Sequence, residues 1–396
     1  MVRSTMLGLM FMVASTTHGL DQRAFDQHVM GLLAEHKLPG LVLHIRHQGR
    51  ELKHQAYGNV DVEGHRLMKT DDIFRIYSMT KPVTAVAMLQ LIDRGLIDFD
   101  DDIRKYLPIL EPLEYEGQEY VVTIHQLMSH TAGFGYGGGL KNWTDIRYLL
   151  ANPLSRNKTN EEMVEAISGI DLKFQPGHKF EYSIASDLQG AIIENVTGLS
   201  LDTYFEKFVF QPLDMVDTGF YVSENAQARL VDMYEYDAST FEEALFFNQE
   251  KIEWIESGEE SDYLTKPSLL SAGGGLVSTS HDYANFAQML LQNGVYKDQR
   301  ILSEASVKKM ISSHTTGLDL HFLPRIYQSV GFGYGVGVQQ ALNEARPQGS
   351  FFWAGMGGTL FWVDPKNDLI VVAMMQVEDG WIALEKWIVP KVYELI

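Results

Sequence analysis

The chain of 396 residues contains no cysteine. This absence excludes disulfide scaffolds, thiolate metal sites, iron–sulfur clusters and cysteine nucleophiles together. It is compatible with either side of a membrane, and a cytoplasmic location is slightly favoured over a periplasmic or secreted one. Only the N-terminus raises the question of targeting, because Arg3 precedes a short apolar stretch. Residues 1–20 are therefore interpreted as an N-terminal extension, with a weak signal peptide over 1–17 as the alternative.

Positive charge is also scarce, since 32 Lys and Arg face 52 Asp and Glu for a formal charge of -20. Such acidity argues against a nucleic-acid partner and against a polybasic membrane surface. Beyond the N-terminus no stretch approaches the ~20 unbroken apolar residues that a membrane span needs. The expected partner is a small molecule, and the oligomeric state stays open.

Hydrophobic patterns predict a sheet built from both ends of the chain. A helix over 22–36, capped by Asp21, precedes a hairpin of strands at 41–47 and 51–57. The middle of the chain reads as helices, and the end as three strands and a helix. The expected middle helices are 82–92, 123–130, 144–151, 160–168 and 187–196, and the late elements are 331–341, 350–363, 369–376 and 378–395.

These elements indicate an α/β fold in which an antiparallel sheet is flanked by helices and interrupted by a mainly helical insertion. The predicted sheet domain is discontinuous and comprises residues 21–73 and 265–396. The predicted helical domain covers 74–264, and an active site is expected at the interface between the two. No internal repeat or low-complexity tract is found.

Metal and nucleotide chemistry find little support. The thirteen histidines include His44 and His47 in a strand pattern, but no HExxH or histidine–carboxylate motif occurs. We therefore expect scattered packing or surface histidines, no metal and no cofactor. A GxGxxG match at 133–138 follows a predicted helix rather than a strand, so a flexible loop is favoured over a dinucleotide site.

The pattern SxxK places a hydroxyl and an amine on one helix face, where the amine can take the hydroxyl proton. It occurs at Ser78–Lys81, Ser155–Lys158 and Ser306–Lys309. Only the first pair opens a helix that is apolar all round. The second lies in a polar stretch, and the third heads an ordinary surface helix.

Burial matters because a lysine base must lose its proton near neutral pH. Lowering the pKa of Lys81 from ~10.4 to about 7–8 costs roughly 4 kcal/mol, which desolvation can supply and open water cannot. A serine at the first helical turn also lies at the positive end of the helix dipole. The competing interpretation is a helix cap followed by a lysine whose head reaches solvent.

Several segments together resemble the serine β-lactamase and penicillin-binding-protein superfamily, and within it the class C-like family VIII carboxylesterases. The resemblance covers most of the chain in the family's order, from the hairpin at 41–60 onward. Its segments are FRIYSMTKP (74–82), TIHQLMSHTAG (123–133), FQPGHKFEYS (174–183), FQPLDMVDTGF (210–220), GGGLVSTSHDYANFAQMLL (273–291), GFGYGVGV (331–338) and WAGMGGTLFWVDP (353–365).

The resemblance implies a β-lactamase-like fold with Ser78 as nucleophile and Lys81 as its paired base. The family's YxN element matches at Tyr182, which would be the second general acid/base, whereas an ordinary core tyrosine is the alternative. The family's KTG element reads Trp353-Ala354-Gly355, the WxG form of family VIII esterases. Ser78 and Met356 would then supply the backbone N–H groups of the oxyanion hole.

Two departures from the lactamase pattern bear on the substrate. Trp353 replaces a lysine that binds the drug's carboxylate, and Ile184 replaces the asparagine of YxN. With Gly355, which would let the strand approach the substrate, these residues form the expected substrate-binding set. Losing polar recognition groups shifts the preference from acidic amides toward neutral esters. Trp353 as a plain sheet residue, and Asp187 as either a support of the Tyr182 loop or a helix-start carboxylate, remain alternatives.

The predicted function is a serine carboxylesterase that hydrolyses small neutral, short-chain esters through an acyl-enzyme on Ser78. The alternatives are a β-lactamase, D-amino peptidase or acyltransferase of the same superfamily and, more remotely, an inactive binding or sensor domain. The acidic charge concentrates at 224–262, where twelve acidic residues face two basic ones among several aromatics. This segment is interpreted as an acidic aromatic wall or lid that repels carboxylates, or as a solvated helical surface.

Overall fold

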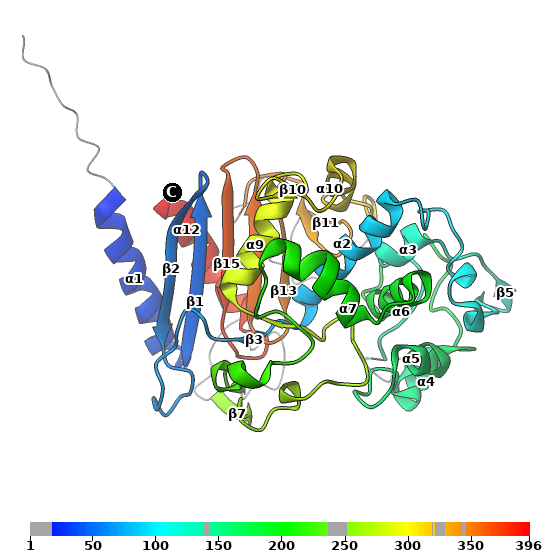
Figure 1. Cartoon of the computed structure of the whole chain (residues 1–396), viewed down its shortest axis with the longest axis horizontal. Coiled ribbons are helices and arrows are strands. Elements are labelled where there is room, and N and C mark those ends of the chain that lie inside the picture. Colours follow the sequence, from blue (N-terminus) through cyan, green and yellow to red (C-terminus); the bar gives the residue numbers. More distant parts are fainter. Residues whose placement is uncertain (1–17, 138–141, 237–251, 319, 321–328, 342–345) are drawn as a thin grey trace, which may run out of the picture.

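A computed structural model describes residues 18–137, 142–236, 252–318, 320, 329–341 and 346–396, and its centre is a seven-stranded antiparallel sheet (Figure 1). Both ends of the chain contribute strands, as expected, and the predicted fold class is confirmed. The spatial order is β11 (Val330–Phe332), β12 (Gly337–Gln339), β13 (Phe351–Gly355), β14 (Thr359–Asp364), β15 (Leu369–Met374), β1 (Gly40–His47) and β2 (Arg50–Gly58).

Two segments that were expected as single strands are hairpins. The segment 331–341 divides into β11 and β12, and 350–363 divides into β13 and β14. Both arms of each hairpin are buried and mainly apolar. The residues between the arms are glycines and apolar residues, so no polar turn marks the bend in the sequence. Glycines make the turns, because Gly335 and Gly358 have φ angles of 73° and 92°, which favour glycine.

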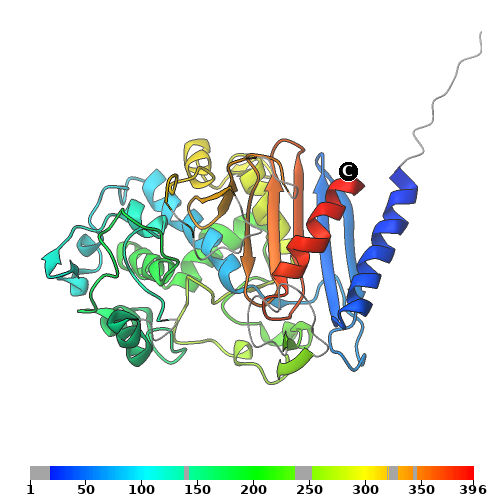
Figure 2. The same cartoon turned by 180° about the vertical axis from the view of Figure 1, so that it is seen from behind.

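Helices cover both faces of the sheet. On one face lie α1 (His18–Glu35) and α12 (Val389–Leu395), seen in front of the strands in Figure 2. On the other lies α9 (Ser280–Leu291), which contacts β1, β14 and β15. Because α1 begins at His18, Asp21 is not its cap. The expected helix 378–395 is divided into α11 (Trp381–Ala383), a π-helical turn and α12, where a proline at the first turn cannot continue the preceding hydrogen bonds.

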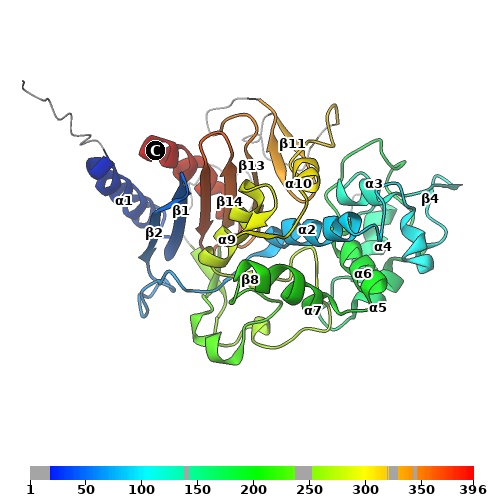
Figure 3. The same ribbon diagram turned by 45° about the horizontal axis from the view of Figure 1, so that its top comes forward.

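The helical part lies beside the sheet (Figure 3) and is built around α2 (Thr80–Asp93). Every residue of α2 from Thr80 to Leu91 is buried, as its all-round apolar sequence predicts. Further helices among the described residues are α3 (Ile124–Met128), α4 (Trp143–Ala151), α5 (Asn160–Ile167), α6 (Ala185–Thr197), α7 (Leu201–Phe205) and α10 (Glu304–Met310). The domain boundaries at 73/74 and 264/265 stay a prediction.

The segment leading into α2 connects the helical part to the sheet. It comprises the short strand β3 (Phe74–Arg75) and the 3-10 turn η1 (Tyr77–Met79), and β3 pairs with β8 (Val277–Ser278). Among the helices that the structure describes, none combines the length and apolar character needed to cross a bilayer. The predicted signal-peptide segment 1–17 lies outside the described residues.

Candidate active site

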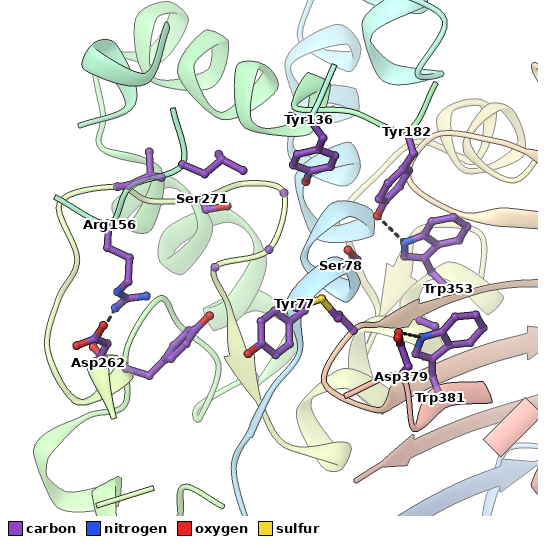
Figure 4. A pocket seen from close by; sticks show the side chains of 18 of the residues that line it. Tyr77, Ser78, Tyr136, Arg156, Tyr182, Asp262, Ser271, Trp353, Asp379 and Trp381 are labelled. Carbon is purple, nitrogen blue, oxygen red and sulfur yellow. Dashed lines mark hydrogen bonds between the residues drawn. The ribbon is translucent and has the colours of Figure 1, made fainter. Parts of the chain in front are cut away.

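Ser78 lies in η1 and faces a cavity of about 720 Å³ (Figure 4). Its neighbour Tyr77 has a φ of 41°, a conformation that costs energy for a bulky residue and is often found at functional sites. Tyr182, Trp353 and Met356 line the same cavity. The structure therefore brings four of the predicted site residues, from three separate segments, around one space.

Lys81 is buried directly beneath Ser78. Its Nζ lies 3.1 Å from the Ser78 Oγ, 2.6 Å from the Gly273 carbonyl oxygen and 3.3 Å from the Tyr136 hydroxyl. A neutral amine has two protons and one lone pair, so it can donate to Gly273 and Tyr136 while accepting from Ser78. Burial lowers the pKa of Lys81 to about 7, and Asp187 acts in the opposite direction. The contacts and the pKa both suit a base.

Tyr182 lies above the lysine. The Lys81 Nζ is 4.5 Å from the Tyr182 ring centroid, and the Trp353 Nε1–H donates to the Tyr182 hydroxyl at 3.2 Å. Burial raises the pKa of Tyr182, and hydrogen bonds with Ser78 and Trp353 act in the opposite direction. The hydroxyl therefore keeps its proton near neutral pH, which suits a proton donor.

Ile184 does not take the expected place against the substrate. It is fully buried, and the residues lining the cavity do not include it. Its backbone N–H donates to the Gly135 carbonyl at 3.1 Å, just before α6 begins. On the same loop, the Ser183 N–H donates to His130 Nδ1, and the His130 ring packs 4.9 Å from that of Tyr182. These contacts fix the loop that presents Tyr182.

Gly355 packs against backbone and is not among the residues that line the cavity. A Cβ built at this position would lie 2.3 Å from the Ile76 carbonyl oxygen. The glycine thus allows β13 to approach the segment before Ser78, and its expected role toward the substrate stays a prediction. Met356 follows immediately, at the cavity. The close packing of Gly355 on the segment before Ser78 therefore accompanies the shared position of Ser78 and Met356 at one cavity.

Comparison with known proteins identifies the family. Residues 25–388 match the model named Beta-lactamase. The chain belongs to the β-lactamase family. A relative in Mycobacterium tuberculosis, protein Rv1367c, is 30% identical over 367 residues that cover 86% of each chain. The predicted superfamily is thereby confirmed.

Other relatives of this β-lactamase family member carry esterase names. Esterase EstB of Burkholderia gladioli is 36% identical over 213 residues, which cover 53% of each chain. Lovastatin esterase of Penicillium rubens is 27% identical over 77% of this chain and 80% of its own. Among solved structures, EstCE1, a hydrolase with promiscuous acyltransferase activity, superimposes with a TM-score of 0.76 at 25% identity, covering 94% of this chain and 99% of its own.

Two further groups complete the surroundings of Lys81, and the sequence singled out the first of them, Asp187, without its contacts near the lysine. Asp187 lies in the first turn of α6, and its Oδ1 accepts from the Ser271 Oγ at 2.6 Å and the Gly273 N–H at 3.1 Å. The helix-start interpretation is therefore right about its location, and its side chain holds the segment 271–273 instead of the Tyr182 loop. A Cβ at Gly273 would lie 2.4 Å from Asp187 Oδ2. The three consecutive glycines at 273–275 were the sequence feature that could have indicated this close packing.

Tyr136 is the residue that the sequence reading missed, and it lies within the GxGxxG match. The match follows α3 and no strand leads into it, while Gly138 lies outside the described residues. A Cβ at Gly133 would lie 2.6 Å from the Phe174 carbonyl oxygen, so this glycine allows close backbone packing. The motif therefore positions a tyrosine beside Lys81. An aromatic residue set between glycines could have indicated this role.

The rest of the cavity wall is mainly apolar and carries few charges. Leu154, Tyr263, Leu269 and Trp381 supply apolar surface. The charged lining residues are Arg156, Glu256, Asp262 and Asp379. The guanidinium of Arg156 donates to the Asp262 carbonyl oxygen at 2.9 Å and stacks over Tyr263. Carboxylates thus outnumber the one cation among the described lining residues.

The acidic segment 224–262 is only partly described, since 237–251 lie outside. Its described parts include a 3-10 turn at Glu224–Arg229 and the paired strands β6 (Met233–Tyr236) and β7 (Ile252–Glu256), so the helical alternative fails only for the residues of the two strands. Glu256 and Asp262 border the cavity. The interpretation of this segment as an acidic wall stays a prediction, now restricted to these two positions.

The rival SxxK pairs lie in other settings. The Ser306 Oγ donates to Asp93 Oδ1 at 2.7 Å, and Lys309 is exposed. Ser155 and Lys158 occupy a turn in which the Lys158 N–H donates to the Ser155 carbonyl. None of the four lines the cavity.

Three histidines that look scattered in the sequence come together in the fold. The β1–β2 register sets His44 opposite His54, and His281 lies on α9, with ligand nitrogens within 4.8 Å of one another. The rings of His44 and His54 stack 4.1 Å apart at an angle of 14°, so their in-plane lone pairs do not converge. The Arg46 Nε also lies 3.3 Å from the His44 Nε2. The Glu51 carboxylate lies 3.1 Å from the same nitrogen, so His44 is held by stacking and by two polar side chains, and the expectation of no metal stays a prediction.

Proposed function

We propose that this protein is a serine carboxylesterase that hydrolyses neutral esters through an acyl-enzyme on Ser78. The observation that carries the proposal is the buried Lys81 amine, which lies 3.1 Å from the hydroxyl of a serine that faces the cavity. The esterase relatives support the same reaction class.

In the proposed acylation, the Ser78 Oγ attacks the ester carbonyl carbon and its proton passes to Lys81. The carbonyl oxygen becomes an oxyanion held by the backbone N–H groups of Ser78 and Met356. As the C–O bond to the alcohol breaks, Tyr182 donates its proton to the leaving oxygen. The resulting phenolate is stabilised by the new ammonium, because Lys81 Nζ lies 4.5 Å from the Tyr182 ring centroid.

Deacylation reverses these proton movements. The Tyr182 phenolate takes a proton from water as the water oxygen attacks the acyl carbon. The tetrahedral intermediate then releases Ser78, whose oxygen recovers the proton from the Lys81 ammonium. The acid departs, and both bases return to their starting states.

The cavity supports neutral substrates. Trp353 offers no charge where a lactamase has lysine, and Glu256, Asp262 and Asp379 line the wall. A volume of about 720 Å³ also exceeds what a short acyl chain fills, since pockets of ≈300–1,000 Å³ enclose drug-sized ligands. We therefore extend the expected short-chain esters to bulkier neutral ones.

The test combines a panel of p-nitrophenyl esters from acetate to dodecanoate, nitrocefin and a fluorophosphonate probe. We expect ester turnover to exceed that of nitrocefin and the probe to label Ser78. Faster nitrocefin turnover would favour a β-lactamase, because Arg156 could then be binding the drug's carboxylate. An unlabelled Ser78 would favour a binding domain.

Acyl transfer to an alcohol is a second candidate, supported by the apolar wall of Leu154, Tyr263, Leu269 and Trp381. In an apolar cavity a bound alcohol competes with water for the acyl-enzyme. Chromatography of reactions containing a primary alcohol would then show a new ester beside the free acid, and free acid alone would contradict this activity.

A further inference from the structure

Gln376 lies just after β15 and is 2% exposed. Its side-chain Oε1 accepts from the Arg75 N–H at 2.7 Å. Its Nε2 donates to the Gly357 carbonyl oxygen at 2.9 Å and lies 3.3 Å from the Arg75 carbonyl oxygen. The amide therefore pairs with the Arg75 backbone as a neighbouring strand would, and its remaining proton reaches a second segment.

The two segments joined by Gln376 carry the two expected oxyanion donors. Arg75 belongs to β3, which leads through η1 to Ser78. Gly357 follows Met356 directly in the turn between β13 and β14. Hydrogen bonds within the β13–β14 turn do not fix the distance between this turn and β3. The Gln376 amide does connect them, because it bonds to Arg75 of β3 and to Gly357 of the turn.

The Gln376 side chain is closely packed against the turn that contains Gly357. A Cβ at Gly357 would lie 2.4 Å from the Gln376 Nε2 and 2.7 Å from the Tyr77 ring. The Thr359 hydroxyl adds only a longer contact of 3.4 Å to the Ile76 carbonyl oxygen. Gln376 thus makes the shorter polar contacts between β3 and this turn.

We propose that Gln376 is a positioning residue that sets the separation of the Ser78 and Met356 N–H groups. The proposal rests on the acyl-enzyme reaction proposed above. Oxyanion donors act when they lie 2.7–3.1 Å from the developing charge, so a small widening weakens both. Because the oxyanion forms after substrate binding, the loss falls on kcat and not on KM.

The test is Gln376→Met, which keeps the length of the side chain and removes its hydrogen bonds. We expect kcat for a p-nitrophenyl ester to fall about 10- to 100-fold, somewhat less than on losing a donor outright, with KM within about threefold. Fluorophosphonate labelling of Ser78 should slow in parallel, because the phosphoryl oxygen occupies the same donors. The pH at half-maximal rate should not move, since Lys81 is untouched.

Gln90 provides a matched control. It is another buried amide with three hydrogen-bonding partners, the carbonyls of Phe208 and Ile301 and the hydroxyl of Tyr204. Gln90→Met should lower thermal stability to a similar extent while kcat stays within about twofold. Gln376→Asn, which is shorter by one methylene, provides a second variant if Gln376→Met fails to fold, and it should lower kcat in the same way.

The outcomes separate this inference from the proposed function. If Ser78 is labelled and esters are hydrolysed, but kcat of both Gln376 variants matches that of Gln90→Met, the positioning role is wrong and the esterase stands. A rise in KM with kcat unchanged would also overturn it. If the unmodified protein is neither labelled nor active, the proposed function itself fails.

Discussion

In the described part of the chain, two pairs of a serine and a basic side chain have the same separation. Lys81 Nζ lies 3.1 Å from the Ser78 Oγ, and His54 Nε2 lies 3.1 Å from the Ser280 Oγ. Burial lowers the pKa of both bases. Behind His54, the Glu51 carboxylate is 3.9 Å from Nδ1, which gives the second pair the composition of a serine–histidine–carboxylate triad.

Access distinguishes the two pairs. Ser78 lines a cavity, whereas Ser280 has no exposed surface and begins α9 against the sheet. The first base is surrounded by hydroxyl groups at the cavity, and the second stacks on His44 in the packing between β1, β2 and α9. The two pairs therefore share a short contact between hydroxyl and base, and only the serine of the first pair is open to the cavity.

The sharpest test of this comparison removes each hydroxyl. Ser78→Ala should lower kcat/KM for p-nitrophenyl butyrate by about 10⁴-fold or more, because the acyl-enzyme cannot form. Ser280→Ala should leave kcat/KM within about twofold, and labelling by a fluorophosphonate should persist. Activity lost in Ser280→Ala with its fold intact would break the comparison.

The next largest effect removes each base. Lys81→Met keeps the length of the side chain and should lower kcat about 10³-fold, within the range typical of a general base. His54→Gln retains a polar group near Ser280 and should leave kcat unchanged. Circular dichroism of both variants would check the fold, and a Lys81→Met enzyme with near-normal kcat would exclude Lys81 as the base.

The pH dependence of kcat/KM should reflect the ionisation of Lys81 and not that of the histidines. Since the pKa of Lys81 is lowered to about 7, the neutral base is lost below that pH. We expect kcat/KM to rise with pH, reach half its plateau near pH 7 and fall about tenfold per unit well below it. Initial rates with a neutral ester would check this, and a half-maximal rate near pH 10 would contradict it.

Ionisation of the buried histidine His44 should affect the pH dependence of stability instead of that of the rate. Burial lowers the pKa of His44 to about 2, below its ordinary 6.5, so the folded state binds fewer protons than the unfolded state. Stability contributed by neutral His44 is therefore lost as pH falls from 6.5 toward 2. Melting temperatures at pH 7, 6 and 5 should decline, and more shallowly in His44→Phe.

The smallest effect concerns the Trp353 hydrogen bond. Trp353→Phe retains the apolar ring but removes the donor to Tyr182, a bond worth about 1 kcal/mol, so kcat should fall about fivefold. Trp362→Phe is the matched control, because its Nε1 has no hydrogen-bond partner among the described residues. Equal losses in both variants would assign the effect to sheet packing.

Much of the fold followed from periodicity. The hairpin β1–β2 and the helices α2, α4, α5 and α6 lie within a few residues of their predicted bounds, because their apolar patterns and caps are local. The hairpins within 331–341 and 350–363 were missed because burial on both faces removes the alternation of apolar and polar residues.

The site was predictable where chemistry is encoded in neighbouring residues. The spacing of Ser78 and Lys81 belongs to one helical turn, and the structure brings them together. Tyr136, Asp187 and Gln376 act through contacts between distant segments, which no spacing records. The family pattern alone assigned Ile184 and Gly355 to the substrate. In the fold, the Ile184 N–H donates to the Gly135 carbonyl, and Gly355 packs against the Ile76 carbonyl.

The pairing of β1 with β15 has a consequence for synthesis on the ribosome. Val42 lies opposite Met374, so the sheet cannot close until nearly the whole chain has emerged. The turn bearing Met356 and the Gln376 link arrive in the same late stretch. A nascent chain therefore carries Ser78 and Lys81 for most of its synthesis without the strands that complete the cavity around them, and the proposed acylation of Ser78 has to wait until the final strands join.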